Sequence, residues 1–188
     1  MNDQQQAYAR AVEHFGAKVH ATENDQWANA TPCSDWDVRA LVNHVVYENL
    51  WVPELIGGAT VAEVGDRHDG DVLGEDPVAA WDRSAAVASA SVTAEGALDG
   101  QVDTSAGPTS AADYVGQIFM DAVIHGWDLA RGIGADDTIE PAFAERLYGE
   151  VAPREDELKS WGVFGDTVEP PDGADTQTKL LAVLGRVQ

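Results

Sequence analysis

Residues 108–134 read PTSAADYVGQIFMDAVIHGWDLARGIG and carry a long helical pattern. The side chains expected to face inward recur every three or four residues, which is the period of one helix face; they are Val115, Ile118, Ala122, His125 and Leu129. Pro108 to Ser110 favour a helix start, and Gly132 and Gly134 favour its end. The stretch therefore predicts one long helix with a stripe that packs into a core.

Three further stretches carry the same period, at residues 3–24, 35–56 and 76–92. A capping box formed by Ser34 and Asp37 is expected to open the second of them. The segments 57–75 and 94–107 are polar and rich in glycine or aspartate, so we expect loops there. Shorter helices are expected near 141–149 and 176–186, and no alternating strand pattern is visible.

Together these patterns predict an all-α protein. We expect a four-helix bundle over about residues 3–133, followed by a C-terminal helical extension over about residues 134–188. A chain of 188 residues falls within the usual size of one domain. The whole chain, residues 1–188, is therefore expected to form a single domain.

The composition excludes several classes of partner. The chain has 33 acidic and 11 basic residues, a net charge of −22, whereas nucleic acids and anionic membranes bind cationic surfaces. Cys33 is the single cysteine, which excludes an internal disulfide and an all-cysteine zinc site. Because the sequence has neither a secretory signal pattern nor about 18 consecutive apolar residues, we expect a cytoplasmic protein.

Three residues suggest a metal site. Asp121 and His125 are four residues apart, so they lie on one face of the predicted helix. If His44 in the second helix faces them, the set has two histidines and one carboxylate, with positions left open for a ligand. The alternative is that both histidines are core residues with hydrogen-bond partners, Asp121 being one such partner.

Three blocks of the sequence resemble a known family. Residues 31–45, TPCSDWDVRALVNHV, look like the opening signature of the mycothiol-dependent maleylpyruvate isomerase N-terminal family. This family belongs to the DinB-like (YfiT-like) superfamily of metal-binding four-helix bundles. Residues 125–131, HGWDLAR, resemble its H-x-W-D-L-A block, and the run from Phe164 to Arg186 is similar to the tail of stand-alone actinobacterial members.

The resemblance implies a DinB-like bundle that binds a divalent metal through His44, Asp121 and His125. The metal is usually zinc, although imidazole and carboxylate ligands also suit nickel, iron and manganese. Family members often have glutamate at the position of Asp121, one methylene longer. Glu48 lies one helical turn after His44, so we regard it as the alternative carboxylate ligand.

Residues near these ligands have functional and structural interpretations. Asp128 is three residues beyond His125 and is placed either to orient its ring or to pair with an arginine. Trp36 is interpreted as a packing residue or a pocket wall, and Arg39 as a surface residue or an anchor for an anionic substrate. Cys33 is interpreted as a small buried residue in a turn, or as a thiol near a helix N-terminus, which favours the thiolate. The resemblance places it outside the metal set.

The resemblance also implies a function. It indicates a metal-dependent enzyme that uses mycothiol or another low-molecular-weight thiol, with a small-molecule substrate and a transferase or isomerase reaction. The characterised family enzyme has a C-terminal domain for which this sequence is too short, so we expect the metal-binding bundle without the whole isomerase. The alternatives are a non-catalytic protein that binds a metal or small ligand, and a metal-dependent hydrolase. Relatives are often dimers, and an acidic surface permits a homodimer where salt screens it.

Overall fold

A computed structural model of the chain describes residues 1–155 and 167–187. It consists of two compact units, Met1–Asp137 and Thr138–Gln188. The regular structure of the described residues is helical apart from one two-stranded hairpin. The prediction of an all-α, DinB-like fold is therefore confirmed.

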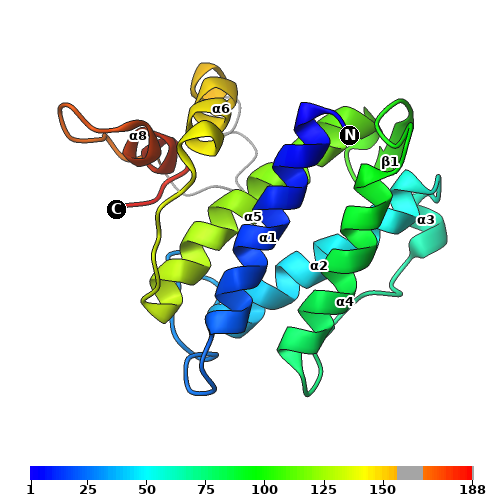
Figure 1. The fold of residues 1–188 in the computed structure, drawn as a ribbon, viewed down its shortest axis with the longest axis horizontal. Coiled ribbons are helices and arrows are strands. Elements are labelled where there is room, and N and C mark those ends of the chain that lie inside the picture. Colours follow the sequence, from blue (N-terminus) through cyan, green and yellow to red (C-terminus); the bar gives the residue numbers. More distant parts are fainter. Residues whose placement is uncertain (156–166, 188) are drawn as a thin grey trace. The chain divides into compact units, whose positions relative to one another are not determined.

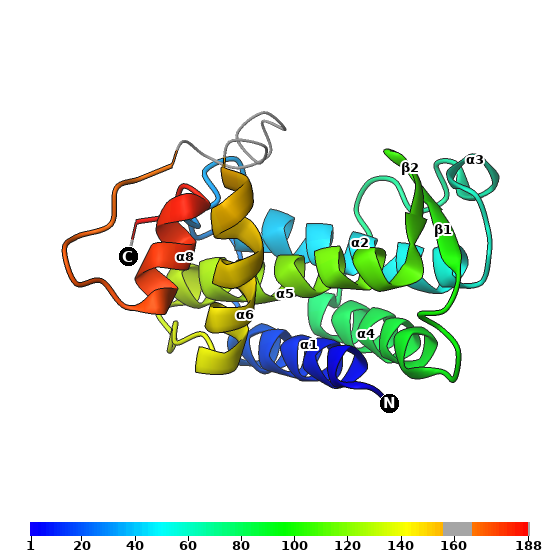
Figure 2. The same ribbon diagram turned by 90° about the horizontal axis from the view of Figure 1, so that it is seen from above.

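The first unit is built from four long helices, α1 (Asp3–Ala21), α2 (Val38–Ile56), α4 (Pro77–Thr93) and α5 (Ala111–Ile133). Helix α1 packs against α4 and α5, and α2 packs against the same two helices, which closes a four-membered ring (Figures 1 and 2). The largest fully buried side chains on these helices form the core; they are Tyr8, Phe15, Val19, Val38, Leu41, Phe119, Trp127 and Leu129.

Side chains at the helix starts satisfy backbone N–H groups that have no partner within the helix. Asn2 and Gln5 form a capping box at α1. Asp76 caps α4, which has proline at its first position, and Ser110 caps α5. Helix α5 ends at Gly134, whose φ of 69° is in the left-handed region that favours glycine.

Two local predictions are wrong. Helix α2 begins three residues later than the Ser34 capping box requires, because the Asp37 side chain itself caps it by accepting a hydrogen bond from the Ala40 N–H. The structure also corrects the loop predicted at 94–107 and the helix start predicted at Pro108. Part of this region forms a hairpin, in which β1 (Gln101–Thr104) pairs antiparallel with β2 (Gly107–Ser110). Strands of four residues are too short to give a clear alternating pattern.

The loop after α2 contains a short helix, α3 (Val61–Val64), with a capping box between Thr60 and Glu63. In the second unit, α6 (Pro141–Val151) continues into the 3-10 helix η1 (Ala152–Arg154) and packs against α8 (Thr176–Val183). Residues 164–166 of the C-terminal sequence block lie outside the described residues. No helix within the described ranges is long and apolar enough to span a membrane.

Candidate metal centre

Helices α2 and α5 bring together three side chains of types that can bind a metal ion. His44 lies in the middle of α2, and Asp121 and His125 lie one turn apart on α5. The Nε2 atoms of His44 and His125 each lie 3.3 Å from an oxygen of the Asp121 carboxylate. One ligand atom from each of the three residues lies within 4.8 Å of those from the other two. The two histidines and the carboxylate that the sequence suggests as one set therefore lie together.

The second ring nitrogen of His125 is held by another carboxylate. Its Nδ1–H donates to Asp128 Oδ2 over 3.0 Å, and the Asp128 side chain is 0% exposed. This hydrogen bond fixes the ring, so that Nε2 is the nitrogen that faces Asp121. Of the two interpretations of Asp128, the one in which it orients His125 agrees with this contact.

The charges at this point are strongly coupled. Burial lowers the pKa of His125, but the carboxylates of Asp121 and Asp128 outweigh it and raise that pKa to about 9. Burial alone would raise the pKa of Asp121, whereas the neighbouring His125 and His44 hold it well below its ordinary value. An extra positive charge between Asp121 and the two rings is therefore favoured, and a bound proton or a metal ion would supply it.

Glu48 lies near the three residues without joining the group of ligand atoms. Burial, followed by repulsion from Asp121, raises the pKa of Glu48 to about 7. Its side chain lines a cavity of about 250 Å³ together with Tyr47, Trp51 and Tyr114. Asp121 meets both rings and Glu48 does not, which favours Asp121 as the carboxylate of the centre.

An aromatic side chain covers both histidines. The Trp36 ring stacks on His44 with centroids 4.5 Å apart and lies tilted over His125 at 5.4 Å. Trp36 belongs to the turn before α2, in which the Thr31 hydroxyl hydrogen-bonds to the carbonyl oxygens of Cys33 and Trp36. This turn therefore fixes the position of the indole against the two imidazoles.

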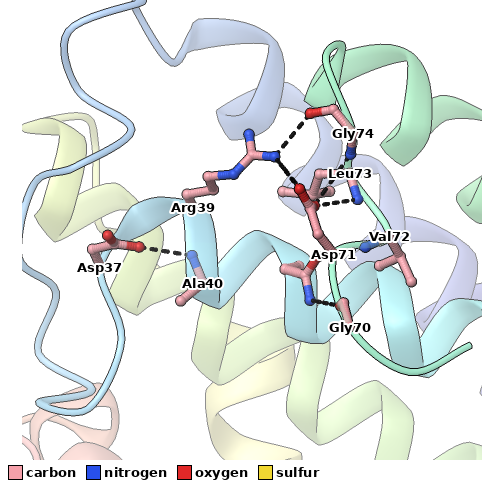
Figure 3. A network of polar contacts seen from close by, with 9 residues as sticks. Asp37, Arg39, Ala40, Gly70, Asp71, Val72, Leu73 and Gly74 are labelled. Carbon is pink, nitrogen blue, oxygen red and sulfur yellow. Dashed lines mark hydrogen bonds and ion pairs between the residues drawn. The ribbon is translucent and has the colours of Figure 1, made fainter.

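A cavity of about 630 Å³ opens beside the centre, and His44 forms part of its wall. The wall also includes Trp36 and Tyr47, together with part of the loop that follows α3. Figure 3 shows how the loop is attached: the Arg39 guanidinium donates to the Asp71 carboxylate and to the Gly74 carbonyl. Arg39 is thus engaged with the protein's own carboxylate, an arrangement that the sequence does not reveal.

Residues 8–130 match the family model described as the mycothiol maleylpyruvate isomerase N-terminal domain. The chain belongs to this family. The match runs from α1 to the last turns of α5 and includes all three residues of the centre.

Two similar proteins are known from two strains of Mycobacterium tuberculosis, both described as uncharacterized. Each is 31% identical to this chain over 184 residues, which is 96% of this chain and 96% of the relative. No solved structure matches the chain. Membership of the mycothiol maleylpyruvate isomerase N-terminal family confirms the resemblance inferred from the sequence blocks at 31–45 and 125–131.

The residues present fit the metal that this family implies. Ligands that lie 2.0–2.2 Å from a tetrahedral ion are about 3.3–3.6 Å apart. Asp121 Oδ1 lies 3.3 Å from His125 Nε2 and 3.5 Å from His44 Nε2, and both separations are of this size. The side chains of His44 and Asp121 are 23% and 29% exposed, while that of His125 is 10% exposed. The centre is thus anchored on its buried side by His125 and accessible on the side of His44.

Cys33, which is interpreted from the sequence as a buried residue outside the metal set, is half-buried. Its sulfur lies within 4.8 Å of ligand atoms of His125 and Asp128. Of the other histidines, His20 pairs with Asp82, and His68 Nε2 lies 3.7 Å from Glu54 without a hydrogen bond.

Proposed function

We propose that the protein binds a divalent metal ion through His44, Asp121 and His125 and uses it in an enzymatic reaction of a low-molecular-weight thiol. The observation that carries the proposal is the convergence of two imidazole nitrogens on one carboxylate, in a family whose description names mycothiol. Zinc is the first ion to test, since two histidines and a carboxylate are an established zinc ligand set. A bound ion of this kind supplies Lewis acidity, which favours the ionised form of a thiol or a water molecule at neutral pH.

The protein's own residues prepare the centre for such an ion. Asp128 accepts the Nδ1 proton of His125, which leaves Nε2 as the nitrogen available for the ion. The Trp36 indole covers one face of the His44 ring and keeps water from that face. Because both rings are held before the ion arrives, little side-chain entropy is lost on binding.

The substrate side of the proposal rests on the larger cavity. A volume of about 630 Å³ lies within the usual range for sites that bind small molecules. His44 is the one residue of the centre that also lines this cavity. A thiol or its reaction partner bound there therefore reaches the centre from the side of α2.

Calorimetry tests the proposal. Mycothiol is titrated into the metal-free protein, the zinc-loaded protein, and an Asp121→Asn variant treated with zinc in the same way. We expect heat of binding from the zinc-loaded protein alone. Equal binding by all three samples, or by none, would contradict a metal-dependent thiol site.

A cobalt-loaded sample gives a second readout. The visible spectrum of cobalt reports its coordination, so a thiol that reaches the ion changes the spectrum. A His20→Ala variant serves as the matched control, because His20 is half-exposed and paired with Asp82 rather than with the centre. We expect the control to behave like the unmodified chain.

A further inference from the structure

The turn that carries Cys33 lies close to the last turns of α5. The side-chain amide of Asn29 donates to the Gly132 carbonyl over 3.0 Å. A Cβ atom at Gly132 would lie 2.8 Å from Val38 Cγ2 and 3.2 Å from Thr31 Cγ2, so the close approach depends on glycine. The chain before α2 is therefore fixed against α5 one turn beyond Asp128.

This approach creates a second group of possible metal ligands. The Cys33 sulfur, a ring nitrogen of His125 and a carboxylate oxygen of Asp128 all lie within 4.8 Å of one another. Asp128 and His125 are both buried, while Cys33 is half-buried. A thiol, an imidazole and a carboxylate in this proximity are the donor types of a mixed-ligand metal site.

The two groups differ in the ion that they favour. The first has only nitrogen and oxygen donors, whereas the second adds a thiolate, which selects soft and borderline ions such as cadmium and zinc. They also share His125, whose Nε2 faces Asp121 and whose Nδ1 faces Asp128. A single ion that uses this ring therefore takes one position or the other.

We propose that Cys33, His125 and Asp128 form a second metal position, for a thiophilic divalent ion, which competes for His125 with the centre formed by His44 and Asp121. On binding, the thiol gives up its proton to solvent, as does the ring nitrogen that becomes a ligand. The carboxylate of Asp128 then contacts the ion in place of the ring N–H. Three protein ligands leave a further coordination position open.

The test uses the full reduced chain and cadmium ions alone. The absorption of a cadmium–thiolate bond and the reactivity of Cys33 toward a disulfide reagent are followed together. We expect cadmium to produce the absorption and to protect the thiol, both in the unmodified chain and in His44→Ala, which keeps all three ligands of the second position. Both effects should disappear in Cys33→Ser.

Two matched carboxylate variants separate the positions. Asp121→Asn removes an oxygen ligand of the first centre and should leave the cadmium–thiolate signal in place, whereas Asp128→Asn should weaken it by about tenfold or more. Circular dichroism of each variant confirms that the bundle is folded. A thiol that reacts at the same rate with and without cadmium in the folded unmodified chain would overturn the proposal.

Failure of this proposal is distinguishable from failure of the proposed function. The zinc content of a Cys33→Ser chain reports on the first centre alone, because the thiolate is removed. Zinc retained there, without any cadmium–thiolate signal in the unmodified chain, leaves the first centre standing and rejects the second. A cadmium–thiolate signal in the unmodified chain, without zinc retained in the Cys33→Ser chain, supports the second position and rejects the first centre.

Discussion

The Nδ1–H of His125 donates to the carboxylate of Asp128 over 3.0 Å, and that carboxylate is completely buried. This contact determines which nitrogen of the ring faces Asp121 and the proposed metal. It also places a negative charge behind the ring, which makes Nε2 a stronger ligand.

Replacing Asp128 with alanine is therefore expected to weaken metal binding by about 10- to 100-fold. Competition with a chelating dye measures the change. Asp82→Ala is the control, because Asp82 holds His20 in an exposed pair away from the centre. Equal affinities for the two variants would contradict an orienting role for Asp128.

The stability of the metal-free protein should fall as the pH rises from about 5 to about 9. The pKa of Glu48 is raised from 4.5 to about 7 by burial and by Asp121, and the pKa of His125 is raised from 6.5 to about 9 by its carboxylate partners, against the effect of burial. Over this range the unfolded chain releases protons that the folded chain keeps, so the free energy of unfolding decreases. Urea denaturation in the presence of a chelator measures it.

The Glu48→Gln variant separates the two contributions. It should flatten the pH dependence below about pH 7 and leave the decline between about pH 7 and pH 9, which belongs to His125. Stability that rises with pH through the upper range would show that His125 does not hold its proton in the folded chain.

Gly132→Ala tests the close approach between the turn and α5. The added Cβ would lie 2.8 Å from Val38 Cγ2, so we expect a loss of about 1–3 kcal/mol in the free energy of unfolding. Gly116→Ala in the same helix is the control, because its Cβ would meet only the flexible Gln4 side chain at 3.7 Å. The control is expected to be neutral or to stabilise the helix by about 0.5–1 kcal/mol.

Asp71→Ala tests the attachment of the loop beside the larger cavity. The Asp71 carboxylate accepts hydrogen bonds from the Leu73 and Gly74 amides as well as from Arg39. Amide hydrogen exchange at Leu73 and Gly74 should become faster in the variant, while the melting temperature changes little, because the pair is exposed to solvent. Unchanged exchange at both amides would show that the loop is held by other contacts, such as that between Asn43 and Gly70.

The sequence predicts the helices and the pairing of two of the three residues of the centre, because both depend only on local spacing. Asp121 and His125 are four residues apart, and any helix places such residues on one face. Whether His44 meets them depends on how α2 is rotated against α5, which follows from the whole core and not from the spacing within either helix. The family resemblance supplied this relationship where the helical period could not.

The parts that were missed depend on contacts between distant segments. Glycine is typical of a helix end, yet Gly132 lies inside α5. The turn at Ala30 and Thr31 approaches this position so closely that it leaves no room for a side chain. The same approach brings Cys33 beside Asp128, 95 positions further along the chain. The short hairpin was missed because each strand has only four residues and β2, which contains glycine and proline, resembles a loop.

The central claim is tested most directly by the zinc content of the untagged protein, measured by plasma mass spectrometry after zinc is supplied and the excess removed. The measurement is made in a Cys33→Ser chain, so that only the centre formed by His44, Asp121 and His125 is counted. We predict about one zinc ion per chain, lost on His44→Ala and on His125→Ala and retained on His20→Ala. A Cys33→Ser chain that is folded and still empty, or that keeps its zinc after His44→Ala, would contradict the account.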